Sequence, residues 1–196
     1  ENRAIYDTEL IQPFRSLIQV MMPAMLAIDA QFETRPHKIL SRIYRDIRFS
    51  KNKQPYKTSM WMSFQRTTTH WENFPGYFME LNTETCMYGM GLYAPKRKTM
   101  DTFREEIGYA QDLFREMTLK TQKEGFQIEG ASYKRPLANS LPDFFQPWMN
   151  RKNVYLVKKL PITDARLYSE TLATLLIDDF MTTADLYRFM VEVAEA

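Results

Sequence analysis

A run of closely spaced basic residues is the part of this sequence best suited to chemistry. Eight lysines and arginines lie between Arg35 and Lys57 against a single acid, Asp46, which gives this stretch a local charge of +7. Guanidinium and ammonium groups bind phosphates and carboxylates, and arginine does so with two parallel hydrogen bonds. The sequence therefore predicts an anion site, and its candidate residues are Arg45, Arg48, Lys51, Lys53, Tyr56, Lys57, Lys134 and Arg135.

A strand and the turn after it must position these cations. Apolar and polar residues alternate from Ile43 to Phe49, a period of two that indicates a half-buried strand. Lys51 and Lys53 fall in the following turn, and Pro55 favours an extended exit from it. Arg45 falls on the apolar face of the strand, where its charge needs a partner or a wet cleft. The candidate partners are Asp46, Glu80 and Glu33.

Two functions from different classes fit this segment. The first is binding, with or without turnover, of a phosphorylated or otherwise anionic small molecule, in a pocket lined by Arg45, Arg48, Lys53, Tyr56 and Arg135. The second is a protein- or nucleic-acid-contacting module without catalysis, whose exposed cations form no pocket and whose binding falls steeply with salt. We favour the first, because few aromatic residues interleave with the basic ones to stack on bases. A purely structural role, with arginines paired internally and lysines solvated, is a third interpretation. Whether the protein is an enzyme is left open.

Several familiar chemistries find no support. The two histidines, His37 and His70, are far apart, and there is no zinc-type Cys/His cluster and no glycine-rich phosphate loop. The lone Cys86 has no basic neighbour, so we expect a buried, inert thiol. Asp178 and Asp179 are adjacent on a predicted helix and point about 100° apart, which favours a solvated face over a metal pair. We therefore expect neither a metal site nor a cofactor.

Composition gives an expectation about the compartment. A single cysteine forms no internal disulfide, which favours a reducing environment. We read no signal peptide at the start and no apolar run of membrane-spanning length, so we expect a soluble, cytoplasmic protein with no membrane partner. The net charge is only +2, although residues 164–196 carry a local charge of −5. Oligomeric state is not predicted.

The order of predicted elements defines the fold class. We expect a helix over 4–31 divided by Pro13 and Pro23, a short helix over 36–42, strands over 43–49, 60–65, 76–81 and 86–93, a helix over 99–124, a strand over 126–135, an irregular stretch over 136–147, a strand over 153–160, and helices over 164–180 and 182–194. Most strands follow one another without crossover helices. This order predicts one α+β domain over 1–196, with a mainly antiparallel sheet of about five or six strands and helices packed on it.

The basic segment also carries a family resemblance. Arg45–Thr58 resembles the pattern R-D-x-R-F-S-K-D-K-x-P-Y-K-T of an uncharacterised bacterial and fungal family, catalogued as domain of unknown function 2461. Pro75–Leu81, Gly89–Pro95 and Tyr133–Pro136 resemble later elements of that family in the same order. The resemblance implies a soluble α+β domain and no particular reaction.

The chain departs from the family pattern in three places. Asn52 stands where the pattern usually has aspartate. The glycine and His-Pro pair that usually follow the last element are replaced by Leu137–Pro142, which puts any role of that histidine in doubt here. The family's N-terminal stretch with a Trp-Phe pair has no counterpart in this chain.

Overall fold

The computed structural model describes residues 2–45, 48 and 53–196. The first part of the chain contains α1 (Asn2–Tyr6), a π-helical turn η1 (Asp7–Ile11), α2 (Gln12–Ile28), α3 (Pro36–Ile39), β1 (Ser59–Phe64), η2 (Trp71–Asn73), β2 (Gly76–Asn82) and β3 (Thr85–Leu92). The second part contains α4 (Arg97–Tyr109), α5 (Gln111–Lys123), β4 (Gln127–Glu129), η3 (Asp143–Phe145), α6 (Gln146–Met149), β5 (Val154–Pro161), η4 (Ala165–Tyr168), α7 (Thr171–Thr182) and α8 (Ala184–Glu195).

The strands form a five-stranded antiparallel sheet in the order β1-β2-β3-β5-β4. The predicted hairpin between β2 and β3 is confirmed, and Oδ1 of Asn82 closes it by accepting from the amides of Glu84 at 2.8 Å and Thr85 at 2.9 Å. Helices and sheet together confirm the predicted α+β class. The strand predicted over 126–135 is shorter than expected, because β4 ends before Gly130, whose φ of +127° leaves the extended region.

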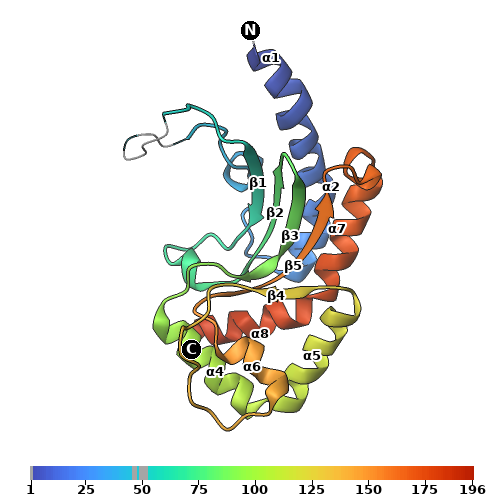
Figure 1. The fold of residues 1–196 in the computed structure, drawn as a ribbon. Coiled ribbons are helices and arrows are strands. Elements are labelled where there is room, and N and C mark those ends of the chain that lie inside the picture. Colours follow the sequence, from blue (N-terminus) through green and yellow to red (C-terminus); the bar gives the residue numbers. More distant parts are fainter. Residues whose placement is uncertain (1, 46–47, 49–52) are drawn as a thin grey trace.

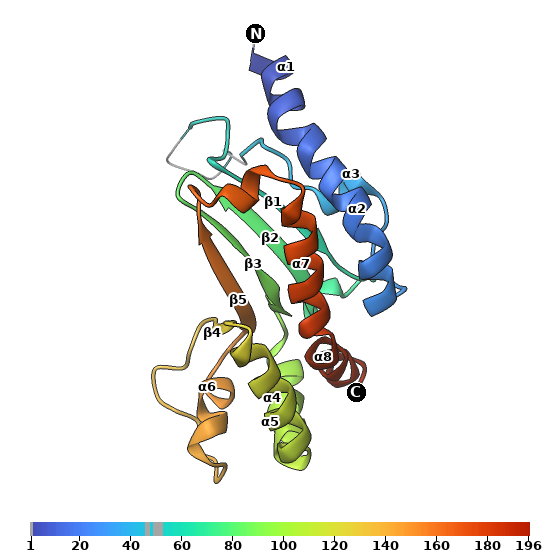
Figure 2. The same cartoon turned by 90° about the vertical axis from the view of Figure 1, so that its right-hand side faces the viewer.

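One face of the sheet is covered by helices and the other is not. Alternate residues of β1 and β3, among them Met62, Phe64, Tyr88 and Met90, are buried beneath helices. Figure 2 shows α2, α7 and α8 together on this side of the sheet. The residues between them, such as Trp61 and Ser63, face the opposite side, which we call the open face.

The N-terminal helix is continuous where the sequence predicted breaks. Pro13 comes directly after the π-helical turn η1, so the helical hydrogen-bond pattern changes just before this proline, and Pro23 lies inside α2. The prediction of a break at Pro23 was wrong, because burial of Ile18, Met21 and Met25 in the core holds α2 together across this proline, whereas next to Pro13 the helix does change, to a π-helical turn.

The helix from Arg3 to Ile28 has the length and apolar composition to cross a membrane. Core helices meet the same criterion, and the C-terminal part of this one belongs to the core. The length and apolar composition of this helix are therefore weak support for a membrane segment.

The predicted helix over 99–124 is interrupted. It is two helices, α4 and α5, which meet at Ala110, whose backbone has φ −113° and ψ 42°. The break lets a residue of each helix reach the same aromatic cluster: Phe103 of α4 and Phe114 of α5 lie 6.2 and 5.3 Å from the ring of Phe189 in α8. Gly125 ends α5 with φ +88°, as the sequence predicted.

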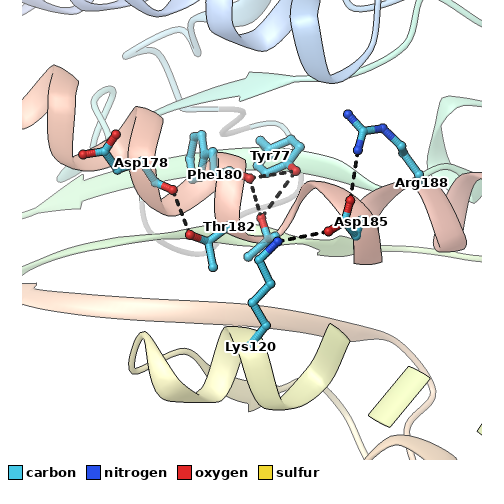
Figure 3. A network of polar contacts seen from close by, with 8 residues as sticks. Tyr77, Lys120, Asp178, Phe180, Thr182, Asp185 and Arg188 are labelled. Carbon is cyan, nitrogen blue, oxygen red and sulfur yellow. Dashed lines mark hydrogen bonds and ion pairs between the residues drawn. The ribbon is translucent and has the colours of Figure 1, made fainter. Parts of the chain in front are cut away.

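Polar contacts link the junction of α7 and α8 to β2 and to α5 (Figure 3). The Tyr77 hydroxyl of β2 donates to the Phe180 carbonyl at 3.2 Å, so a buried strand residue satisfies the C-terminal end of α7. On the surface, Asp185 of α8 pairs with Lys120 at 3.0 Å and with Arg188 at 3.1 Å. The junction therefore has one buried and one exposed part.

Candidate functional site

The segment that precedes β1 turns back on itself outside the sheet. Tyr44 and Tyr56 pair across it in a single antiparallel bridge. The Arg45 amide donates to the Pro55 carbonyl and the Lys57 amide donates to the Ile43 carbonyl, both at 2.9 Å. We call residues 42–45, 48 and 53–57 the basic arm, and Figure 1 shows it projecting from β1 on the side opposite to α2 and α7. Ile43, Tyr44 and Arg45 thus pair within the arm, and the described residues of the predicted strand 43–49 are not part of the sheet.

The cations of the basic arm lie in solvent. Arg45, Arg48 and Lys53 are exposed, and Lys57 is half-buried. The expectation that Arg45 lies on a buried strand face was wrong, because its backbone pairs with Pro55 and not with the sheet. Among the described parts of the chain, Arg45 and Arg42 make no side-chain hydrogen bond or ion pair. Lys51 and Asp46 lie outside the described residues.

Neither of the other two candidate partners neutralises Arg45. Glu33 instead holds Arg35, accepting from its Nε at 2.8 Å and its Nη2 at 2.6 Å. These hydrogen bonds from Arg35 lower the pKa of Glu33 to about 2. Glu80 lies on the open face of the sheet.

Two exposed tyrosines sit among these cations. Tyr44 and Tyr56 are 64% and 54% exposed, and their ring centroids are 5.7 Å apart. Arg42 and Arg45 flank Tyr44, and Lys57 follows Tyr56. The arm therefore offers two adjacent exposed aromatic rings in a segment that also carries exposed cations.

The two cations predicted to join from another part of the chain do not reach the arm. Lys134 and Arg135 are exposed in the segment that follows β4. That segment lies near α6 in both views, at the end of the molecule away from the basic arm (Figures 1 and 2). The described candidate residues of the predicted anion site thus lie in two places: most belong to the basic arm, and Lys134 and Arg135 lie on a distant part of the surface.

A groove of about 390 Å³ occupies the open face. Aromatic side chains from several elements line it: Trp61, Trp71, Phe78, Tyr93 and Tyr155. None of the described cations of the basic arm lines it. Its charged lining residues are both acidic, Glu72 and Glu80.

Glycines in β3 shape the floor of this groove. A Cβ at Gly91 would lie 2.3 Å from the Val154 carbonyl oxygen, and one at Gly89 would lie 1.9 Å from the Leu156 carbonyl oxygen. Because Gly89 and Gly91 carry no side chains, the rings of their cross-strand neighbours Phe78 and Tyr155 meet edge to face, 6.3 Å apart at 83°. Such an arrangement contributes about 0.5–1.5 kcal/mol beyond burial.

One residue joins the arm to the groove. The Lys57 ammonium lies 6.0 Å from the centroid of the Trp61 ring, at the outer limit of a cation–π contact. Trp61 in turn pairs with Glu80 across β1 and β2. The Lys57 ammonium, the Trp61 indole and the Glu80 carboxylate are therefore neighbours in that order, from the arm into the groove.

Comparison with known proteins shows which family the sequence belongs to. A family model described as a conserved hypothetical protein, DUF2461, matches residues 1–189. The chain belongs to the DUF2461 family. No curated protein matches it at a significant level.

One buried arginine of this DUF2461 chain has a structural role. Arg104 is buried in α4, and its Nε donates to the Met149 carbonyl at 2.8 Å while Nη2 donates to the Arg151 carbonyl at 2.5 Å. Its guanidinium also lies 5.6 Å from the ring of Tyr133. Arg104 therefore ties α4 to the segment between β4 and β5, and leaves Lys134 and Arg135 on the surface of this DUF2461 chain.

The acidic pair on α7 corrects the prediction of a solvated face. Asp178 is exposed as expected, but Asp179 is buried. Its carboxylate accepts from the Tyr88 hydroxyl at 2.7 Å and from the Lys158 ammonium at 2.9 Å. The prediction was wrong because the two side chains point to different sides of α7, and one of these sides faces the sheet.

The single thiol behaves as the sequence predicted. Cys86 is fully buried beside Tyr88 in β3, and burial raises the pKa of its thiol to about 12. The thiolate needed for nucleophilic attack is therefore scarce at neutral pH.

The groove is the feature that sequence reasoning missed. A signal was present, because Trp61, Phe78 and Tyr155 occupy positions that a one-sided sheet usually gives to polar residues. Aromatic residues at such positions indicate either that both faces of the sheet are buried or that the second face binds a ligand. That Trp71 of η2 also lines the groove could be seen only once the fold was known.

Proposed function

We propose that this protein binds single-stranded nucleic acid through the basic arm. The observation that carries the proposal is the exposed Tyr44–Tyr56 pair, which lies in the same arm as the exposed cations Arg42 and Arg45. Aromatic faces stack on bases of any sequence, and neighbouring cations contact the phosphates. We also propose that the protein is soluble and cytoplasmic. The single cysteine, Cys86, is a free thiol, which supports a reducing compartment.

The geometry favours this function over the small anionic molecule that the sequence favoured. A small-molecule site needs a pocket in which Arg45, Lys53 and Arg135 converge, and Arg135 lies in a segment at the other end of the molecule. The groove near the arm is lined by Glu72 and Glu80, which repel an anion. An exposed, projecting arm suits an extended polyanion better.

The tyrosine pair favours nucleic acid over an acidic protein. In the sequence, aromatic residues are sparse around the cations, but the fold brings Tyr44 and Tyr56 together from the two sides of the arm. Base stacking contributes about 1–3 kcal/mol per base in single-strand complexes. The carboxylates of an acidic peptide cannot stack on the tyrosine rings, so such a peptide lacks this contribution to the binding free energy.

Fluorescence anisotropy with a labelled oligothymidine tests the proposal. If Arg42, Arg45, Arg48 and Lys53 each contact a phosphate, log K falls against log salt with a slope of about −3. Replacing Arg42 and Arg45 by alanine removes two contacts, which makes the slope shallower by about 1.4. Replacing Tyr44 and Tyr56 by alanine weakens binding and leaves the slope nearly unchanged.

The matched control removes the same charge elsewhere. Lys134→Ala with Arg135→Ala deletes two exposed cations at the far end of the molecule and is expected to leave the affinity and the slope unchanged. Equal losses in the arm and control variants would mean that only net charge matters. No binding of the oligonucleotide, or equal binding of polyglutamate, would also refute the proposal.

A further inference from the structure

The groove on the open face is a second, separate site, and we propose that it binds a small organic cation with an alkylated ammonium group. It is concave and mostly apolar, and its volume of about 390 Å³ falls within the range of small-molecule sites. Aromatic rings reach it from β1, β2, β5 and η2. Alkylated ammonium groups bind against such rings because the ring faces are electron-rich and the alkyl groups are weakly hydrated.

The charges inside the groove select for a cation. Glu72 and Glu80 line it, and no lysine or arginine among the described residues does. Within the described parts of the chain, Glu80 makes no hydrogen bond or ion pair, and the nearest basic group to Glu72 is Nδ1 of His70 at 3.9 Å. An uncompensated carboxylate in a partly desolvated groove is stabilised by a bound cation.

The aromatic rim already attracts cations of the protein. The Lys57 ammonium lies 6.0 Å from Trp61, and the Arg66 guanidinium lies 5.3 Å from Phe74. Arg66 is also bound to Asp29 at 2.6 Å, so its charge is compensated. Among the residues that the structure describes, this leaves one uncompensated cation, Lys57, at the rim and two carboxylates in the lining, so the net charge around the groove is negative.

The exposure of the rings shows that the groove can admit such a ligand. Trp61 and Trp71 are 40% and 42% exposed, and Tyr93 is 68% exposed. The polar groups of the remaining lining, such as Ser63 and Gln65, suit a hydroxyl on the ligand. Choline has both the alkylated ammonium and the hydroxyl, and serves as the probe.

Tryptophan fluorescence provides a direct readout. The chain has three tryptophans, of which Trp61 and Trp71 line the groove while Trp148 is fully buried. Choline is expected to change the emission in a saturable way. Its neutral isostere, 3,3-dimethylbutanol, has the same shape without the charge and is expected to bind about tenfold more weakly.

Two variants locate the site, and one controls for charge. Glu80→Gln removes the charge with little change of shape and is expected to weaken choline about fivefold or more while leaving the isostere unchanged. Trp71→Leu lies in an exposed turn, and it is expected to weaken both probes without unfolding the protein. Glu84→Gln changes an exposed carboxylate of the β2–β3 hairpin outside the groove and is expected to have no effect.

Three results would overturn the inference: no saturable response to choline, equal affinity for choline and its isostere, or equal effects of Glu80→Gln and Glu84→Gln. Circular dichroism and the melting temperature of each variant separate lost binding from lost folding. Arg42 and Arg45 do not line the groove, so alanine at both positions is expected to leave choline binding intact.

Discussion

The Tyr187 hydroxyl of α8 donates a hydrogen bond of 2.6 Å to Oδ2 of Asp29, the residue at the end of α2. The Nε of Arg66 binds the same oxygen at 2.6 Å, and its Nη1 reaches Glu195 at 2.6 Å. Asp29 and Tyr187 are both buried. One carboxylate therefore joins the first long helix, the end of β1 and the last helix of the chain.

Removing the hydroxyl of this pair is expected to destabilise the fold. Tyr187→Phe keeps the ring, which lies 5.3 Å from Phe32 and 5.2 Å from Tyr77, and deletes one hydrogen bond to a charged group. The free energy of unfolding should fall by about 1.5–3 kcal/mol, measured by urea denaturation. In the control Tyr168→Phe, an exposed hydroxyl bound to the Ile162 carbonyl is lost, and a change below about 0.5 kcal/mol is expected. Equal changes would contradict the role of Asp29.

The same carboxylate predicts acid sensitivity. Burial of Asp29 on its own raises the pKa, but hydrogen bonds from Tyr187 and Arg66 outweigh burial and hold it below the ordinary value of 3.8. Because the folded-state pKa is the lower one, the stabilisation is complete above the unfolded-state pKa and is lost as pH falls through the folded one. Asp29→Asn should therefore be less stable than the wild type at neutral pH, with the difference in urea midpoint shrinking below about pH 3.8. Parallel curves for the two proteins down to acid unfolding would refute this.

The sheet and its helices were predictable because their patterns are local. The alternation of Met60, Met62 and Phe64 and the stripe of Phe103 and Ile107 each require only one element to be read. The interruption at Ala110 was not predictable, because it results from the shared contact of α4 and α5 with a residue of α8 far along the chain.

The candidate site was predictable only in part. The basic segment and its turn follow from composition, but whether Arg45 is buried depends on which strand pairs with it, and that is a tertiary property. Likewise, the distance between the arm and Arg135 follows from the connections of the sheet. The groove combines side chains from β1, η2, β2, β3 and β5, and no single stretch of sequence contains its pattern.

The buried ion pair of Asp179 should be far more sensitive than a surface pair. Asp179→Ala leaves the half-buried Lys158 without its carboxylate and removes the acceptor of Tyr88, so a loss of about 3–5 kcal/mol is expected. Asp185→Ala is the matched control, because Asp185 pairs with Lys120 and Arg188 in solvent (Figure 3), and a loss below about 1 kcal/mol is expected. Chemical denaturation of both variants measures the difference. Comparable losses would mean that Asp179 is hydrated in the folded protein.

The close approach of β3 to β5 should make Gly91 intolerant of even one methyl group. A Cβ there would lie 2.3 Å from the Val154 carbonyl oxygen and 2.5 Å from the Tyr155 Cα, and backbone atoms cannot move aside as a side chain can. Gly91→Ala should lower stability by about 1–3 kcal/mol, the usual cost of overpacking. Gly108 in α4 is the matched control, since nothing lies within 4 Å of its added Cβ and alanine favours the helix by about 0.5–1 kcal/mol. Melting temperatures of the two variants should therefore move in opposite directions. A Gly91→Ala protein as stable as the wild type would show that β3 and β5 can separate, and the groove floor that these strands form would then have no fixed shape.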